Sequence, residues 1–242
     1  MRYFFSALMF CSVVAAAVMA QPVPSKAVSL FKKGKQLQEQ GMYLEAVAVY
    51  KKAIVADKKY DSSYLALASL YLRISQNDSA VQVLKAAIKM KPGLTAAHEL
   101  MGMVYRDYIR NSAEAMLHYT NAVKLDSTNK ASWYALAWCC NDLKRYEEAI
   151  AYAVKALDID NAYRPAYNEM AHAYRKLGTY KEAIAAFRKR LDVSVTDQPL
   201  YYSGLCYIEL KDKEGAQKMY DELQKLQSKS ADALKKRIEK ME

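Results

Sequence analysis

The sequence predicts an all-α solenoid built from stacked antiparallel helix pairs. One pattern of residues occurs twice, 34 positions apart. Its first copy is Trp133, Leu136, Ala137, Ala149 and Ala156, and the corresponding residues of the second copy are Tyr167, Met170, Ala171, Ala183 and Arg190. Two helices and a turn fit within such a period, and a single pair cannot bury its own apolar side, so the pairs must stack. Hydrophobic residues make up 52% and charged residues 26% of the 242, with seven glycines and five prolines, which is typical of a folded helical chain.

Two series of small residues define six repeats. The first series marks the middle of each first helix, at Gly34, Ala68, Gly102, Ala137, Ala171 and Gly204. The second marks each second helix, at Ala46, Ala80, Ala115, Ala149, Ala183 and Ala216. Side chains no larger than methyl let helix axes cross at about 8–10 Å. We therefore expect repeats at 27–60, 61–94, 95–129, 130–163, 164–196 and 197–228, followed by a capping helix within 229–242.

The turns inside the repeats are marked by Gly41 and Gly178, which occupy equivalent positions. The third repeat carries one residue more than its neighbours, before Glu114 and Ala115. We place the extra residue in the turn at 110–112, where a longer loop is tolerated on the surface.

Residues 1–20 have the features of a secretory signal peptide. Arg2 supplies a positive start, an apolar run extends from Phe4 to Val18, and small residues precede an expected cleavage site near Ala20–Gln21. An uncleaved membrane anchor is the alternative, although the run is shorter than the ~20 residues of a spanning helix. Residues 21–26 are expected to form an extended lead-in. The mature protein is then exported, to the periplasm or the extracellular space.

Charge and composition limit the classes of partner. The net charge is +10 for the full chain and +9 without Arg2, a surplus that favours anionic partners in general. Export and the dispersion of the basic residues over most repeats argue against nucleic acid. The final segment, Ser230 to Met241, has basic residues but no aromatic anchors on its apolar side, so membrane contact is expected to be at most peripheral.

Cysteines and histidines give no sign of catalysis, metal or cofactor. Without the leader, Cys139, Cys140 and Cys206 remain, an odd number that does not form a disulfide framework. Cys140 falls at a core position, where a buried thiol acts as a small hydrophobe. The histidines are His98, His118 and His172, and none has a second ligand at metal spacing or a nucleophile in a recognisable arrangement. We expect no enzyme and no bound cofactor.

The repeats resemble the tetratricopeptide repeat family over residues 27 to about 228. The fifth repeat matches most closely, through Tyr167, Met170, Ala171, Tyr174, Gly178, Tyr180, Ala183 and Phe187. The match lapses at Arg190 and Leu223, where alanine is usual, and at Lys33, where leucine is usual. The resemblance implies a right-handed superhelix whose first helices line a concave groove for a peptide or a helix of a partner, and a protein without catalytic activity.

One well-known ligand type of the family is not expected here. In a well-known subset of the family, a two-carboxylate clamp holds the C-terminus of a partner. The clamp uses lysine, asparagine and arginine side chains from three successive repeats. The corresponding positions in this chain hold Phe31, Lys35, Ala66, Ala96 and Leu100. This chain therefore lacks the residues that would bind a chaperone tail of that type.

The expected binding residues come from repeats three to six. The positions that the family turns toward the groove hold large aromatic or polar side chains there, the types that anchor partners: Arg106, Tyr134, Trp138, Asn141, Asn168, His172, Arg175 and Tyr201. Trp138 is the leading candidate, with packing against the adjacent helix as the alternative. The first two repeats offer fewer polar anchors.

These features together predict a protein-binding or peptide-binding scaffold of the cell envelope, with its site in the groove of repeats three to six. A structural protein that forms homo-oligomers through stacked repeats is the alternative, because an array of repeats can also bind a second copy of itself.

Overall fold

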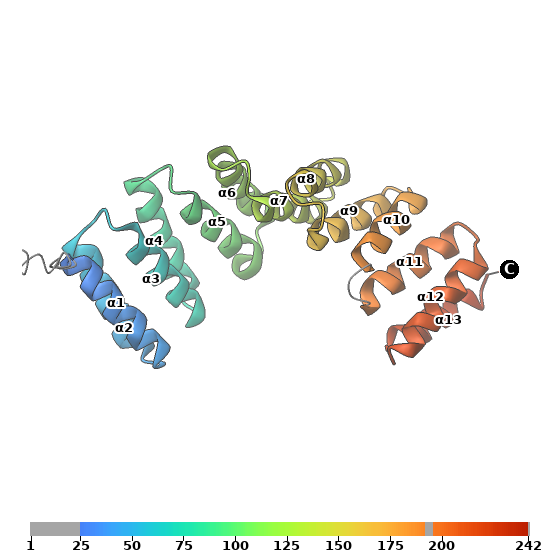
Figure 1. Ribbon diagram of the computed structural model, residues 1–242, viewed down its shortest axis with the longest axis horizontal. Helices are drawn as coiled ribbons and strands as arrows, with labels where there is room; N and C mark the ends of the chain where they lie inside the picture. Colours follow the sequence, from blue (N-terminus) through green and yellow to red (C-terminus); the bar gives the residue numbers. More distant parts are fainter. Residues whose placement is uncertain (1–24, 192–195, 242) are drawn as a thin grey trace, which may run out of the picture.

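The computed structural model of the chain describes residues 25–191 and 196–241, and every regular element within these residues is a helix. The helices lie side by side along an arch, with α1 and α2 at one end and α12 and α13 at the other (Figure 1). The all-α solenoid with a capping helix is therefore confirmed. The expected signal peptide and most of the lead-in lie outside the described residues.

The helices follow one another in pairs, each pair being one antiparallel hairpin. In order they are α1 (Lys26–Glu39), α2 (Tyr43–Ala56), α3 (Asp61–Arg73), α4 (Asn77–Met90), α5 (Thr95–Met103), the π-helix η1 (Val104–Ile109), α6 (Ser112–Leu125), α7 (Lys130–Asp142), α8 (Tyr146–Ile159), α9 (Arg164–Lys176), α10 (Tyr180–Leu191), α11 (Asp197–Glu209), α12 (Lys213–Lys225) and α13 (Ser230–Ile238). Helix α1 begins at Lys26, and the hydroxyl of Ser25 accepts a hydrogen bond from the backbone N–H of Val28 at 3.3 Å.

Small residues lie where neighbouring helices cross, either within a pair or against the capping helix. A methyl group on Gly34 would come within 2.6 Å of the ring of Tyr50, which is 1% exposed on the partner helix. A methyl group on Gly204 would come within 2.5 Å of Leu234 in the capping helix. Ala171 and its equivalents are fully buried. These contacts leave no room for a larger side chain, which is the reason for the repeated small positions.

Each hairpin turns through one residue in the left-handed conformation. Gly41 and Gly178 take this place in two repeats, with φ of 77° and 79°. The remaining repeats use Ser75, Arg110, Lys144 and Lys211 at φ between 59° and 62°. The next backbone N–H closes the helix end, as when Gln76 donates to the carbonyl of Tyr71 at 2.8 Å. The turn geometry is thus constant although glycine is not.

The extra residue of the third repeat lies in the helix, so its expected position in the turn is wrong. The left-handed residue follows the small marker by seven positions in the other repeats, but Arg110 follows Gly102 by eight. The backbone N–H of Asn111 correspondingly bonds the carbonyl of Tyr105, six residues back, where the equivalent bond elsewhere spans five. The surplus is absorbed by the π-helical segment η1, which widens the helix locally and leaves the turn unchanged.

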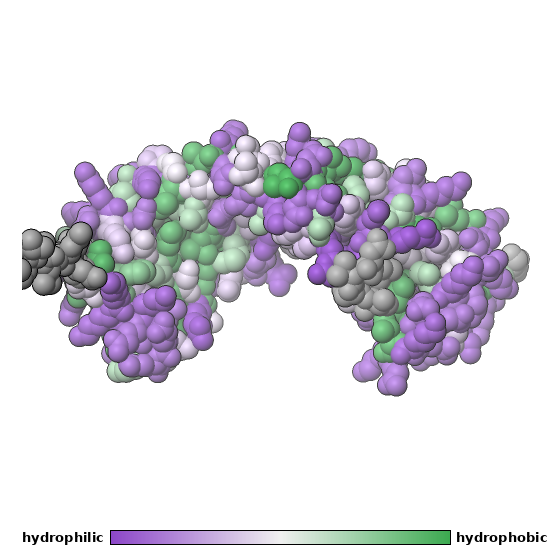
Figure 2. Space-filling model, viewed as in Figure 1, coloured by the Kyte–Doolittle hydropathy of each residue, from purple (hydrophilic) through white to green (hydrophobic). Residues whose placement is uncertain are grey.

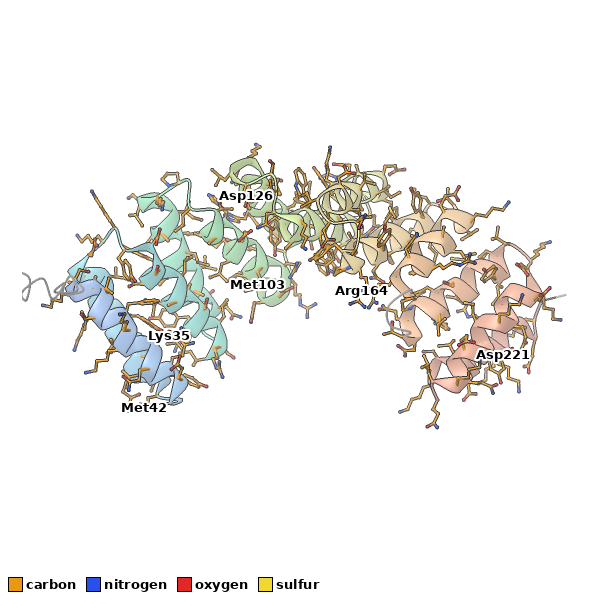
Figure 3. All side chains as sticks on the ribbon, viewed as in Figure 1. Lys35, Met42, Met103, Asp126, Arg164 and Asp221 are labelled. Carbon is orange, nitrogen blue, oxygen red and sulfur yellow. The ribbon has the colours of Figure 1, made fainter. Side chains whose placement is uncertain are left out.

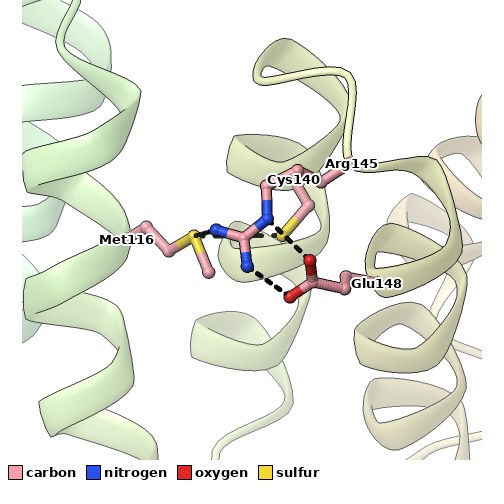
Figure 4. Close-up of polar contacts among 4 residues, drawn as sticks. All are labelled: Met116, Cys140, Arg145 and Glu148. Atoms are coloured by element: carbon pink, nitrogen blue, oxygen red, sulfur yellow. Dashed lines mark hydrogen bonds and ion pairs between the residues drawn. The ribbon is translucent and has the colours of Figure 1, made fainter.

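The cysteines are buried in the packed layers, as expected for Cys140. The Cys140 thiol lies 4.0 Å from the sulfur of Met116 and under the Arg145 side chain, whose guanidinium donates to both carboxylate oxygens of Glu148 at 2.6 Å (Figure 4). Burial raises the pKa of the Cys140 thiol to about 11. The same cause raises the pKa of Cys139 to about 12 and that of Cys206 to about 11. All three are protonated near neutral pH and unsuited to nucleophilic chemistry.

The capping helix α13 covers the open apolar side of the last pair. It contacts both α11 and α12, and it buries Ala231, Leu234 and Ile238 while its lysines stay exposed. Leu234 is 0% exposed and lies directly on Gly204. A terminal repeat needs such a cover, because its outer face has no further neighbour.

We expect Leu234→Ala to destabilise the C-terminal end by about 2–5 kcal/mol, because it removes a fully buried side chain and leaves a cavity over Gly204. Amide hydrogen exchange resolved by segment measures the effect, which should be largest in α11 to α13. Lys236→Ala, at an exposed position of the same helix, serves as the control and should change the unfolding free energy by less than about 0.5 kcal/mol. Unchanged protection of α13 in Leu234→Ala would contradict this account of the cap.

Candidate functional site

The first helices of the pairs form the inner side of the arch. Contacts link α1 with α3, α3 with α5, and α7 with α9, whereas the second helices are not in comparable contact with one another in the described part of the chain. Met103 in α5 and Arg164 at the start of α9 lie at this inner side, and Asp126 after α6 lies on the opposite side (Figure 3). The space-filling surface is hollowed under the arch, with hydrophobic surface over α3 to α5 and hydrophilic surface at both ends (Figure 2).

Two neighbouring pockets lie along this side, each of about 420 Å³. The α7–α9 pocket is formed mainly by residues of α7, α9 and α11. The α5–α7 pocket is formed mainly by residues of α5 and α7. Both are large enough for one or two side chains of a partner.

The structure brings six of the eight sequence-predicted residues into these two pockets. Trp138, Asn141, Asn168 and His172 line the α7–α9 pocket. Arg106 and Tyr134 line the α5–α7 pocket. The other two, Arg175 and Tyr201, line neither. Both contact Tyr202, which lines the α7–α9 pocket. The Arg175 guanidinium lies 4.6 Å from the centre of the Tyr202 ring, and the centre of the Tyr201 ring lies 5.7 Å from that of Tyr202.

Arg106 and Trp138 stand between the two pockets. The guanidinium of Arg106 lies 5.7 Å from the ring centres of both Trp138 and Tyr119, and it donates to both carboxylate oxygens of Asp107 at 2.7 and 2.9 Å. Arg106 belongs to η1, so the π-helical segment contributes a side chain directly to the site. Trp138 therefore both packs against a neighbouring element and lines a pocket.

The side chain of Asn141 is more buried than expected for a residue that faces the groove. It is 8% exposed, and its amide Nδ2 donates to the backbone carbonyl and to the carboxylate Oε2 of Glu169, both at 2.9 Å. These two hydrogen bonds link α7 to α9. Asn141 thus forms part of the floor of the α7–α9 pocket.

Glu169 is a pocket residue that the sequence reasoning missed. It is only 7% exposed, and burial raises the pKa of its carboxyl group against the opposing hydrogen bonds from Asn141 and Asn168 and the more distant charge of Arg106. One signal was present in the sequence: Ala66, Leu100 and Ala135 occupy the equivalent position of repeats two to four, while the first repeat has Lys32 there. A charged residue at a position that is apolar in the three repeats before it indicates a local function or a buried polar network.

His172 lies in the same pocket in its neutral form. Burial lowers the pKa of its imidazole, and the nearby charges of Arg175 and Lys176 lower it further. Its Nδ1 atom is buried without a hydrogen-bond partner among the described residues. His98 is an interior histidine, since it is 6% exposed, and its Nε2 lies 3.1 Å from the carbonyl oxygen of Pro92.

The side chains of the pockets are mainly aromatic and amide groups. Within residues 25–191 and 196–241, no group of three or more histidine, cysteine, aspartate or glutamate side chains is placed to hold a metal ion. Over the same ranges, no helix has the length and apolar character needed to cross a bilayer. The pockets offer aromatic faces, amides and one buried carboxylate.

The fold and its inner pockets define a helical-repeat protein of the superhelical type. The family model described as the Tetratricopeptide repeat protein 21 C-terminal ARM domain matches residues 17–175, and tetratricopeptide repeat models match residues 165–194 and 200–230. The chain therefore belongs to the tetratricopeptide repeat family. A comparison with curated proteins finds no match.

Solved structures share this fold at low sequence identity. PilW, described as a widely conserved type IV pilus biogenesis factor, has a TM-score of 0.72 and 19% identity, covering 88% of this chain and 99% of its own. YrrB, described as a tetratricopeptide repeat protein with an unusual peptide-binding site, has a TM-score of 0.68 and 20% identity over 77% and 97%. Pseudomonas aeruginosa pilF has a TM-score of 0.68 and 17% identity over 83% and 91%. These likenesses establish the architecture.

We expect the buried carboxyl of Glu169 to make stability fall as the pH rises. Its pKa is raised in the folded chain, so the stabilisation that it provides is fully present below the unfolded-state pKa and is lost as the pH rises through the folded-state pKa. Relative to wild type, the unfolding free energy of Glu169→Gln should therefore increase as the pH rises above about 4, where a free glutamate ionises. Urea unfolding at a series of pH values measures it. Parallel pH curves for the two proteins would contradict this expectation.

Proposed function

We propose that the chain is a non-catalytic scaffold of the cell envelope that binds a segment of a partner protein along the inner side of repeats three to six. The observation that carries the proposal is the pair of adjacent pockets, which are separated by Arg106 and Trp138 and lined by six residues chosen from the sequence alone. A peptide segment crossing this partition could place one side chain in each pocket.

The two pockets differ in the side chains that they suit. Leu100 and Met103 give the α5–α7 pocket apolar surface, and its Glu99 carboxylate already accepts hydrogen bonds from Asn129 and Ser132. This pocket fits an aliphatic or aromatic side chain. The α7–α9 pocket holds amides and the Glu169 carboxylate and fits a polar one.

Binding would be driven by a few desolvated anchors. Trp138 is half-buried and presents an indole to the α7–α9 pocket, and Arg175 is stacked on Tyr202 at its edge. Aromatic and arginine side chains dominate the energetics of protein interfaces because they combine large contact area with directional polar groups. Stacking also fixes the Arg175 side chain before the partner arrives, which lowers the entropy cost of binding.

Two structures of similar fold support a binding role, and the N-terminal sequence supports the envelope location. PilW is described as a type IV pilus biogenesis factor, and YrrB as carrying a peptide-binding site. Residues 1–20, which lie outside the described residues, have the pattern of a signal peptide with cleavage near Ala20–Gln21. A protein with this leader and this fold would meet its partner after export.

We expect the double variant Trp138→Ala, Arg175→Ala to lose at least about 30-fold in affinity for the partner, since truncating a central anchor costs about 2 kcal/mol or more. The partner is first isolated by affinity purification from the envelope fraction and identified. The purified pair is then titrated by calorimetry.

Lys155→Ala, Lys181→Ala is the matched control, because both lysines are exposed on second helices, away from the pockets. Its affinity should equal that of the wild type. Light scattering at the same concentrations separates partner binding from self-association through stacked repeats. Unchanged affinity in the folded Trp138, Arg175 double variant would move the binding site elsewhere.

A further inference from the structure

The α7–α9 pocket contains a buried carboxylate without a cation. Glutamate is rarely this buried unless a positive group neutralises it. Among the described residues, no lysine or arginine nitrogen forms an ion pair with Glu169, and its hydrogen bonds come from the neutral amides of Asn141 and Asn168. Arg106, whose charge lowers the pKa of Glu169, is already paired with Asp107. The pocket therefore has an uncompensated site for positive charge.

A second unpaired acceptor lies beside it. The Nδ2 atom of Asn141 is fixed by two acceptors of Glu169, so Oδ1 of the same amide must point away from them. This Oδ1 atom is buried and has no hydrogen-bond partner among the residues that the structure describes, on a side chain that is 8% exposed and lines the pocket. An unsatisfied buried acceptor costs about 1–3 kcal/mol, which a ligand that supplies a donor would recover.

The remaining wall suits the stem of an alkyl chain. The rings of Trp138, Phe187 and Tyr202 line the pocket, and its volume of about 420 Å³ exceeds what one extended side chain requires. A lysine buries its four methylenes against such surface while its ammonium group makes the polar contacts. The two lysines at the rim, Lys144 and Lys176, are exposed, so solvent screens their repulsion.

We propose that the α7–α9 pocket is a subsite for a primary ammonium group on an alkyl stem, such as a lysine side chain of the bound segment. The inference rests on the proposed function and adds the chemistry of the partner. The ammonium hydrogens bond the Glu169 carboxylate and the Asn141 Oδ1 atom. A guanidinium fits less well, because the Asn141 amide already donates to Oε2 of the carboxylate, one of the two oxygens that a bidentate contact uses.

The experiment uses pentylammonium as the probe, with 1-pentanol as its neutral analogue and pentanoate as its anionic analogue. Trp138 is the reporter by fluorescence and by the NMR signal of its indole N–H, in a Trp133→Phe background that leaves it as the single tryptophan. We expect saturable binding of pentylammonium and at least about tenfold weaker binding of both analogues, corresponding to the loss of a charged hydrogen bond.

Glu169→Gln removes the charge with little change in shape, and it should weaken pentylammonium binding at least about tenfold. Glu147→Gln is the matched control, because it removes the same charge from an exposed position outside the pocket, and it should bind as the wild type does. Circular dichroism confirms that both variants are folded. Equal binding of pentanol, an unaffected Glu169→Gln variant, or absence of saturable pentylammonium binding would each overturn the inference.

The outcomes separate this inference from the proposed function. Suppose that pentylammonium binding depends on Glu169, but that the Trp138, Arg175 double variant captures the partner as the wild type does. The ammonium subsite would then stand, and the groove would be rejected as the partner site. Partner capture that depends on Trp138, without pentylammonium binding, would retain the groove and reject the ammonium subsite.

Discussion

The close approach of helices at glycine and alanine is the constraint on which this structure depends. Ala68, Ala137 and Ala171 are fully buried, and the space beside Gly34 and Gly204 is filled by the side chains of Tyr50 and Leu234. Because each pair is held at this distance, the next pair can stack on it with the same geometry. The arch follows from repetition of one local contact, as expected of a protein whose repeats touch only their neighbours.

The same constraint explains where the pockets are. First helices lie along the inner side, where α1 contacts α3, α3 contacts α5 and α7 contacts α9, and large residues between the small ones line it. The π-helical segment in the third repeat changes this regularity at one place and puts Arg106 beside Trp138. A local irregularity in an otherwise periodic chain thus coincides with the partition of the two pockets, in keeping with the frequent occurrence of π-helical turns at functional sites.

Buried polarity sets the α7–α9 pocket apart from the rest of the core. Most of the buried residues are aliphatic, aromatic or small, whereas Asn141 and Glu169 form a polar link between two first helices. Such a link costs stability when its acceptors lack donors or its charge lacks a counterion. The raised pKa of Glu169 reflects that cost directly.

The sequence by itself determined the helix pairs, the period and the cap, because these depend on the spacing of small and large residues along the chain. It also selected six of the residues that line the pockets, since repeat position fixes which way a side chain points. It did not determine the location of the extra residue, because a longer turn and a π-helical segment fit the same residue count. It also did not reveal the Glu169–Asn141 link or the depth of Asn141. Those features depend on contacts between residues 28 positions apart, and only the packing of α7 against α9 decides which side chains meet and which are shielded from water.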